Sequence, residues 1–88
     1  MSQNEYRIEV HESAAKEIRS LPSDVKARVI SAITNLGDNP RPRGCVKLKG
    51  SNTLYRIRVG NYRVVYEVIS SELMIMVTRV RHRREVYE

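Results

Sequence analysis

The sequence has few residues that bind metals or form cross-links: one cysteine and two histidines, with no tryptophan or phenylalanine. The single cysteine, Cys45, excludes an internal disulfide and any zinc site built from paired cysteines. With only His11 and His82 besides, a metal site made by this chain would depend on carboxylates. We therefore expect no metal site and no cofactor.

Long apolar stretches are also lacking. The longest, residues 73–77, is far shorter than the roughly 20 residues that a membrane-spanning helix needs. Residues 1–5 are polar, and no apolar segment of a secretory signal follows them. We expect a cytoplasmic protein without membrane contact. With 88 residues, the chain has room for a single domain, residues 1–88.

Positive charge is what the chain has in excess. Sixteen Lys and Arg residues stand against ten Asp and Glu residues, so the formal net charge is +6. The hydrophobic content of 41% is enough for a core and argues against disorder. Such a basic balance favours a polyanionic partner, nucleic acid first, although solubility alone is an equal explanation. The arrangement of the charges must decide between them.

Periodicity predicts a strand and then two helices in the N-terminal half. Residues 5–11 alternate as in a strand, and residues 12–20 form the first helical pattern. The second pattern is expected to have Pro22 in its first turn and Ser20 or Ser23 as its cap. Its apolar positions are Val25, Val29, Ile30, Ala32, Ile33 and Leu36. Two short helices in series predict a helical hairpin over one face of a sheet.

The C-terminal half predicts a three-stranded antiparallel meander. β-rich segments cover residues 54–59, 62–69 and 73–81, and Gly60-Asn61 suits a type II′ hairpin turn. The order of an N-terminal strand, a helical hairpin and a meander is that of an α+β fold. The helices are then expected on one face of the sheet, with the other face partly open.

The predicted hairpin places cations on one face. A two-residue turn puts Arg58 directly opposite Arg63, and Arg56 shares their face. Glu67 is the only acid expected there. Because directly opposed like charges destabilise a sheet, this arrangement indicates a functional site. The alternative is a solvated edge with splayed arginines.

The C-terminal segment adds further basic and aromatic side chains: Arg81, His82, Arg83, Arg84 and Tyr87. Arginine binds phosphate through two nitrogens, and aromatic rings stack on unpaired bases. Such a combination favours RNA. Double-stranded DNA would more naturally be read by a basic helix in the major groove, and neither predicted helix has a comparable basic face.

Other residues have plainer interpretations. Residues 73–77 are apolar on both sides, which predicts a central strand. Tyr55, Tyr62 and Tyr66 are expected in the core, with their hydroxyls at its rim. His11 ends the first strand and has no visible partner.

Together, residues 47–50 (KLKG), 55–68 (YRIRVGNYRVVYEV) and 80–87 resemble the RelE/ParE toxin superfamily of bacterial toxin–antitoxin systems, and the tail is most similar to the RelE branch. The resemblance implies a microbial-RNase-like α+β fold and an endoribonuclease that cuts mRNA in the ribosomal A site. It also implies an antitoxin partner that wraps the toxin and blocks its basic face.

Carried over residue by residue, the resemblance implies Arg56, Arg58, Arg63, Arg83 and Tyr87 as catalytic residues, although the choice among the tail arginines stays open. RNA or ribosome binding is expected of other basic residues: Lys47, Lys49, Arg41, Arg43, Arg81 and Arg84. The best-known RelE enzyme has lysines where this chain has Arg56 and Arg58. Arginine keeps its proton, so these two can hold phosphate but cannot act as a base.

The implied reaction is attack by a ribose 2′-hydroxyl on the adjacent phosphate, without a metal. It leaves a 2′,3′-cyclic phosphate and a 5′-hydroxyl, while the arginines stabilise the charge that develops on the phosphorane. Tyr87 and His82 are the candidates for proton transfer, and the sequence leaves the choice open. His82 is alternatively a structural anchor of the tail. Tyr87 is alternatively a platform that stacks on a base, or an apolar plug for the C-terminus.

Two other functions stay open. A ParE-like toxin shares the fold but inhibits DNA gyrase. A non-catalytic module would bind RNA or a protein partner through the same arginines without cutting RNA. New 5′-hydroxyl ends in translated mRNA would distinguish the ribonuclease from both.

Overall fold

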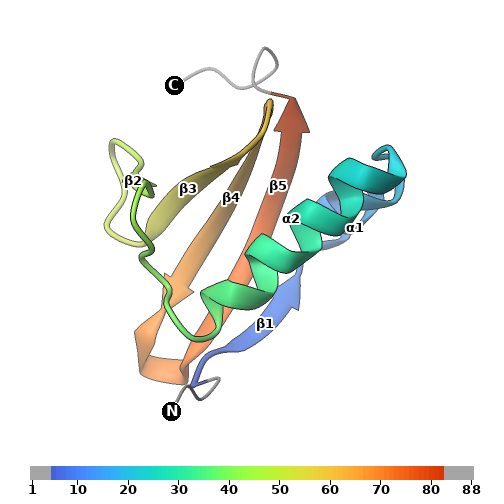
Figure 1. Cartoon of the computed structure of the whole chain (residues 1–88). Helices are drawn as coiled ribbons and strands as arrows, with labels where there is room; N and C mark the ends of the chain where they lie inside the picture. Colours follow the sequence, from blue (N-terminus) through green and yellow to red (C-terminus); the bar gives the residue numbers. More distant parts are fainter. Residues whose placement is uncertain (1–4, 83–88) are drawn as a thin grey trace.

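A five-stranded mixed sheet and two helices make up residues 5–82, the part of the chain that the computed structural model describes. The elements in chain order are β1 (Arg7–Val10), α1 (Glu12–Arg19), α2 (Ser23–Leu36), β2 (Val46–Lys47), β3 (Leu54–Val59), β4 (Tyr62–Ile69), the 3-10 helix η1 (Ser70–Glu72) and β5 (Met74–His82). Both helices lie on one face of the sheet (Figure 1). The predicted α+β class is confirmed.

The strand order is β1-β5-β4-β3-β2. β3, β4 and β5 form the predicted antiparallel meander, and β1 lies parallel to β5 at its outer edge. β5 is therefore an internal strand, as its apolar sequence predicted, and Ile75 and Val77 are fully buried. Leu73 was expected in this strand, but it follows η1 in the left-handed conformation, with φ 50°.

The core lies between the helices and the sheet. Val29, Ile33 and Leu36 of α2 are buried, which confirms most of its predicted apolar face. Ile30 is an exception, with 47% of its surface exposed. Each residue is rotated by about 100° from the one before it in an α-helix, so Ile30 lies outside the stripe that Val29 and Ile33 share.

The starts of the two helices differ from the prediction. His11 caps α1, because its Nδ1 accepts a hydrogen bond from the Ser13 N–H at 3.2 Å, so the expectation that it lacks a partner was wrong. Pro22 lies just before α2, not in its first turn, and makes no side-chain cap bond. Ser20 ends α1 and donates to a carbonyl of that helix, while Ser23 is the first residue of α2. Neither serine caps α2.

The hairpin between β3 and β4 forms as predicted. Gly60 has φ +60°, and Asn61 is not among the described residues with positive φ, which is the pattern of a type II′ turn. The guanidinium of Arg28 on α2 lies against this turn: a Cβ added to Gly60 would be 3.2 Å from its Nη2. The positive φ favours glycine at this position, and a Cβ would also displace the end of the Arg28 side chain by a few tenths of an ångström.

β5 contains a bulge that the sequence analysis did not predict. Val65 pairs with Arg79 and Tyr66 with Val77, which leaves Thr78 as an extra residue on β5. The Thr78 hydroxyl donates to the Val65 carbonyl at 3.1 Å. The extra residue shifts the alternation of side chains by one position after Thr78.

Candidate functional site

Arginines form a row across β3, β4 and β5 on the sheet face opposite the helices. Arg58 pairs with Arg63, and Arg63 pairs in turn with Arg81. The predicted opposition of Arg58 and Arg63 is thus confirmed, and the structure adds Arg81 beside them. Adjacent strands are about 4.8 Å apart, so the side chains of this arginine row can reach one segment of an RNA backbone.

The bulge in β5 is what brings Arg81 to this face. Val77 before the bulge and Val80 after it are both buried, so residues 79 and 81 point away from the core. With unbroken alternation from Val77, both arginines would face the helices. The signal in the sequence that could have revealed the bulge is the spacing of the apolar residues Val77 and Val80, with arginines at 79 and 81.

A second row lies two residues along the strands. Arg56 pairs with Val65, and Val65 pairs with Arg79, so two more arginines flank an apolar residue beside the first row. Arg79 was missed by the sequence analysis. We refer to Arg56, Arg58, Arg63, Arg79 and Arg81 as the arginine cluster.

A small cavity of about 170 Å³ lies at the β3 side of the arginine cluster. Its lining consists of Gly44, Val46, Arg56, Ile57, Arg58 and Arg63. Nη1 of Arg56 and Nε of Arg63 are both shielded from solvent. Because charge interactions are stronger where water is excluded, these two nitrogens make the cavity a candidate place for a phosphate group.

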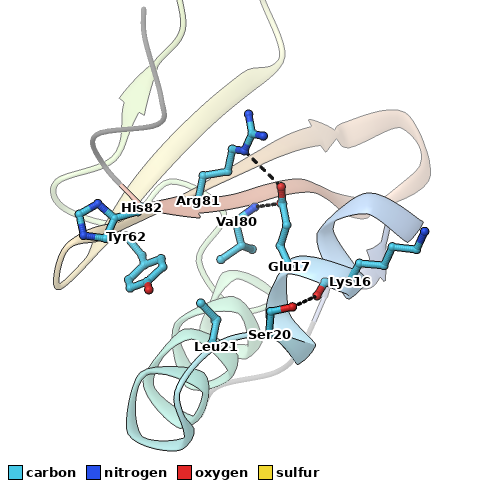
Figure 2. A pocket seen from close by; sticks show the side chains of 8 residues that line it. All are labelled: Lys16, Glu17, Ser20, Leu21, Tyr62, Val80, Arg81 and His82. Atoms are coloured by element: carbon cyan, nitrogen blue, oxygen red, sulfur yellow. Dashed lines mark hydrogen bonds and ion pairs between the residues drawn. The ribbon is translucent and has the colours of Figure 1, made fainter.

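An acid from a helix reaches the cluster. Glu17 on α1 contacts Nε of Arg81 at 3.3 Å through its Oε2 (Figure 2). The same oxygen lies 3.6 Å from Nε of Arg79. The expectation that Glu67 is the only acid near these arginines was therefore wrong. Glu67 accepts a hydrogen bond from the Thr53 hydroxyl at 3.0 Å.

His82 lies on the other face of the sheet. It pairs with Tyr62, and the two rings meet edge to face with their centroids 5.2 Å apart. Both side chains line a pocket of about 480 Å³, which also has residues of α1 in its lining. Figure 2 shows these residues. The position of His82 away from the arginine row favours its alternative interpretation, as a structural anchor.

The other basic residues expected to bind RNA or the ribosome do not all join the cluster. Lys47 pairs with Tyr55, which places it on the helix side of the sheet. Arg41 also lies over Tyr55, 5.3 Å from the ring centroid, and its Nε donates to the hydroxyl at 3.1 Å. This hydrogen bond raises the pKa of Arg41. Arg43 and Lys49 are exposed in connecting segments.

Tyr66 is a structural residue rather than a site residue. It is fully buried, and its hydroxyl donates to the Pro40 carbonyl at 2.7 Å. Burial raises the pKa of Tyr66 well above its usual range, so it keeps its proton. The hydroxyl was expected at the rim of the core but lies within it, where it holds the loop after α2.

The remaining tail residues of the predicted site, Arg83, Arg84 and Tyr87, lie outside the described residues. Their expected roles therefore stay predictions. Within residues 5–82, no helix is both long enough and apolar enough to cross a membrane.

Comparison with known proteins finds relatives that are RelE or ParE toxins. A family model described as the ParE toxin of a type II toxin–antitoxin system matches residues 8–87. The mRNA interferase toxin RelE of Escherichia coli is 34% identical over 86 residues, which cover 93% of this chain and 90% of that protein. A putative toxin RelE1 of Methanocaldococcus jannaschii is 29% identical over 86 residues, 94% of this chain and 96% of that protein.

Solved structures agree with the sequence matches. The archaeal RelE–RelB complex from Pyrococcus horikoshii superposes with a TM-score of 0.82 at 31% identity, over 93% of this chain and 99% of that chain. The intact E. coli RelBE toxin–antitoxin complex gives a TM-score of 0.77 at 32% identity, over 88% of this chain and 95% of that chain. The predicted resemblance is confirmed, and the chain belongs to the RelE/ParE superfamily of type II toxin–antitoxin toxins.

Proposed function

We propose that this toxin is a metal-independent endoribonuclease that cuts mRNA on the ribosome. The observation that carries the proposal is the row of Arg58, Arg63 and Arg81 across three strands. Directly opposed like charges are unfavourable in a sheet, so their retention favours a polyanionic ligand on this face. The E. coli relative that bears the name mRNA interferase supports the same activity.

In the proposed reaction, the ribose 2′-oxygen attacks the adjacent phosphorus and the bond to the 5′-oxygen breaks. The products are a 2′,3′-cyclic phosphate and a 5′-hydroxyl. Arg56, Arg58 and Arg63 surround the small cavity and are positioned to stabilise the additional negative charge on the phosphorane. Arginine does not give up its proton, so a different group must accept the proton of the 2′-hydroxyl.

Tyr87 is our candidate for that proton transfer, with Arg83 beside the cleaved phosphate. His82 is a weaker candidate, because its ring packs against Tyr62 on the helix side of the sheet. We also propose that the ribosome aligns the mRNA strand for attack, since pre-alignment lowers the entropic part of the barrier. Cleavage would then take place in the cytoplasm, where mRNA is translated.

The proposed protein partner is an antitoxin that covers the arginine cluster. The P. horikoshii and E. coli structures are complexes of RelE with RelB, which supports such a partner for this chain. Complementarity with the net charge of +6 favours an acidic segment over the cluster. The complex would then be a hetero-oligomer in which the site is blocked.

A second candidate function is inhibition of DNA gyrase. It is favoured by the family model that matches residues 8–87, whose description is that of a ParE toxin. In that case the arginine cluster would bind a protein or DNA surface, and translated mRNA would stay intact.

Brief inducible expression of the toxin, followed by mapping of mRNA 5′-hydroxyl ends on ribosomes, tests both candidates. The wild type is expected to produce new ends within translated codons. Arg63→Ala and Tyr87→Phe are expected to lose them, whereas Arg19→Ala, an exposed change on α1, should cleave like the wild type. Growth arrest with intact mRNA and gyrase-dependent DNA damage would refute the ribonuclease and support the second candidate. Ribosome binding without cleavage or DNA damage would refute both.

A further inference from the structure

The carboxylate of Glu17 has an unusual set of partners at the end of β5. Its Oε1 accepts a hydrogen bond from the Val80 backbone N–H at 2.7 Å. Its Oε2 contacts Nε of Arg81 at 3.3 Å and Nε of Arg79 at 3.6 Å. Figure 2 shows the side chain extending from α1 to Val80 and Arg81 of β5. One side chain of a helix thus binds both the backbone and two arginines of the cluster.

The sheet topology explains why an acceptor is needed there. β1 ends at Val10, opposite Val77, and the last backbone hydrogen bond on this side runs from the His11 N–H to the Val77 carbonyl at 2.8 Å. Beyond this point no strand among residues 5–82 pairs with the outer edge of β5. The Val80 N–H would lack a backbone acceptor, and a buried N–H without one is costly. Glu17 supplies the missing acceptor.

The ion pair between Glu17 and Arg81 is formed at Nε, the guanidinium nitrogen nearest the aliphatic stem. The guanidinium has five N–H donors, so one contact at Nε does not use its whole capacity to bind a phosphate. The Glu17 side chain is only 22% exposed, so its position is restricted by packing. Arg81 is therefore paired with a carboxylate whose own position is restricted.

We propose that Glu17 is a positioning residue of the RNA site. This inference rests on the proposed ribonuclease function. Glu17 fixes the end of β5 through Val80 and orients Arg79 and Arg81 within the arginine cluster. Without the carboxylate, both arginines gain rotamer freedom and no longer meet the RNA backbone in one arrangement. The excess positive charge still attracts RNA, so the loss is expected in the rate of cleavage and not in binding.

Two substitutions separate the backbone contact from the charge contact. Glu17→Gln keeps an oxygen for the Val80 N–H but loses the charge that holds the arginines. Glu17→Ala loses both. Glu12→Gln is the matched control, because Glu12 lies on the same helix, is exposed, and contacts Arg19 only at 4.0 Å. Each Gln variant raises the formal net charge from +6 by one, so bulk charge effects are equal.

The full-length toxin is assayed on ribosomes programmed with one mRNA, and kcat and KM are measured separately. Glu17→Gln is expected to lower kcat on the order of tenfold or more, as misplaced catalytic groups do. Its KM should stay equal to that of Glu12→Gln. Amide hydrogen exchange at Val80 supplies a readout besides activity: protection is expected to persist in Glu17→Gln and to be lost in Glu17→Ala.

The outcomes are distinguishable. If the wild type and Glu12→Gln cleave mRNA and Glu17→Gln matches them in kcat and KM, the positioning role is wrong while the proposed function stands. If the Val80 amide stays protected in Glu17→Ala, the backbone part of the inference is wrong. If the wild type cleaves no mRNA on ribosomes, the proposed function fails and the inference falls with it.

Discussion

Replacing Arg58 by glutamine removes one charge from the arginine row while most of the aliphatic stem stays in place. Arg58 lies directly opposite Arg63, and such like-charge pairs destabilise a sheet by roughly 0.2–1 kcal/mol. The free energy of unfolding should therefore rise by about 0.5 kcal/mol. In a domain of this size, that corresponds to an increase in Tm of roughly 2–4 °C. Cleavage should fall on the order of a hundredfold, because a preorganised charge at the phosphorane is lost.

The assay is urea denaturation at low salt and again at 1 M salt, combined with cleavage of ribosome-bound mRNA. At 1 M salt the Debye length is about 3 Å, so the repulsion between the arginines is screened and the gain in stability should disappear. Arg19→Gln is the control, since it removes the same charge from an exposed position on α1. It should change stability little at either salt concentration and leave cleavage intact.

Two results would refute this reasoning. If Arg58→Gln is less stable than the wild type at low salt, the row is not a source of repulsion, and its retention needs no functional explanation. If the gain in stability persists at 1 M salt, it has a cause other than charge. A stabilised variant with normal cleavage would separately remove Arg58 from the proposed site.

Further predictions concern structural residues outside the arginine cluster. Tyr66→Phe should lower stability by about 1 kcal/mol at pH 8, because the bond to the Pro40 carbonyl is lost. Burial raises the Tyr66 pKa, so above pH 10 the unfolded chain releases the phenol proton while the folded protein keeps it. The free energy of unfolding of the wild type should therefore fall by about 1.4 kcal/mol per pH unit above pH 10. Urea titrations from pH 8 to 11 should show the stability advantage of the wild type over Tyr66→Phe shrinking. Gly60→Ala should cost about 1–2 kcal/mol, because φ is +60° and the new Cβ meets Arg28; thermal unfolding measures it. His11→Ala should cost about 1 kcal/mol by loss of the α1 cap, measured by denaturation.

Each of these predictions has its own control. A constant difference between Tyr66→Phe and the wild type up to pH 11 would show that the buried hydroxyl titrates normally. Gly60→Asn should be less harmful than Gly60→Ala, because asparagine tolerates positive φ, and the reverse order would contradict the backbone argument. His11→Asn should retain most of the cap, so equal losses with asparagine and alanine would exclude capping as the cause.

The hairpin that carries three of the five arginines of the cluster could be predicted from the sequence. A glycine that suits a two-residue turn and alternation with period two place Arg58 opposite Arg63, and the structure has that register. The internal position of the strand after η1 was also predictable, because residues 73–77 are apolar on both of its faces. These features depend on neighbours in the chain or on local turn geometry.

Tertiary structure alone decided which groups surround that hairpin. Three features depend on segments far apart in the sequence. They are the parallel pairing of β1 with β5, the bulge at Thr78, and the hydrogen bond between Glu17 and Val80. Alternation predicts which residues of one strand share a face. It does not predict which strand lies next to it, or where a bulge shifts the alternation. For this reason the sequence predicted the arginines of the hairpin. Only the folded sheet showed that Arg81 lies beside Arg63 and contacts the carboxylate of Glu17 on α1.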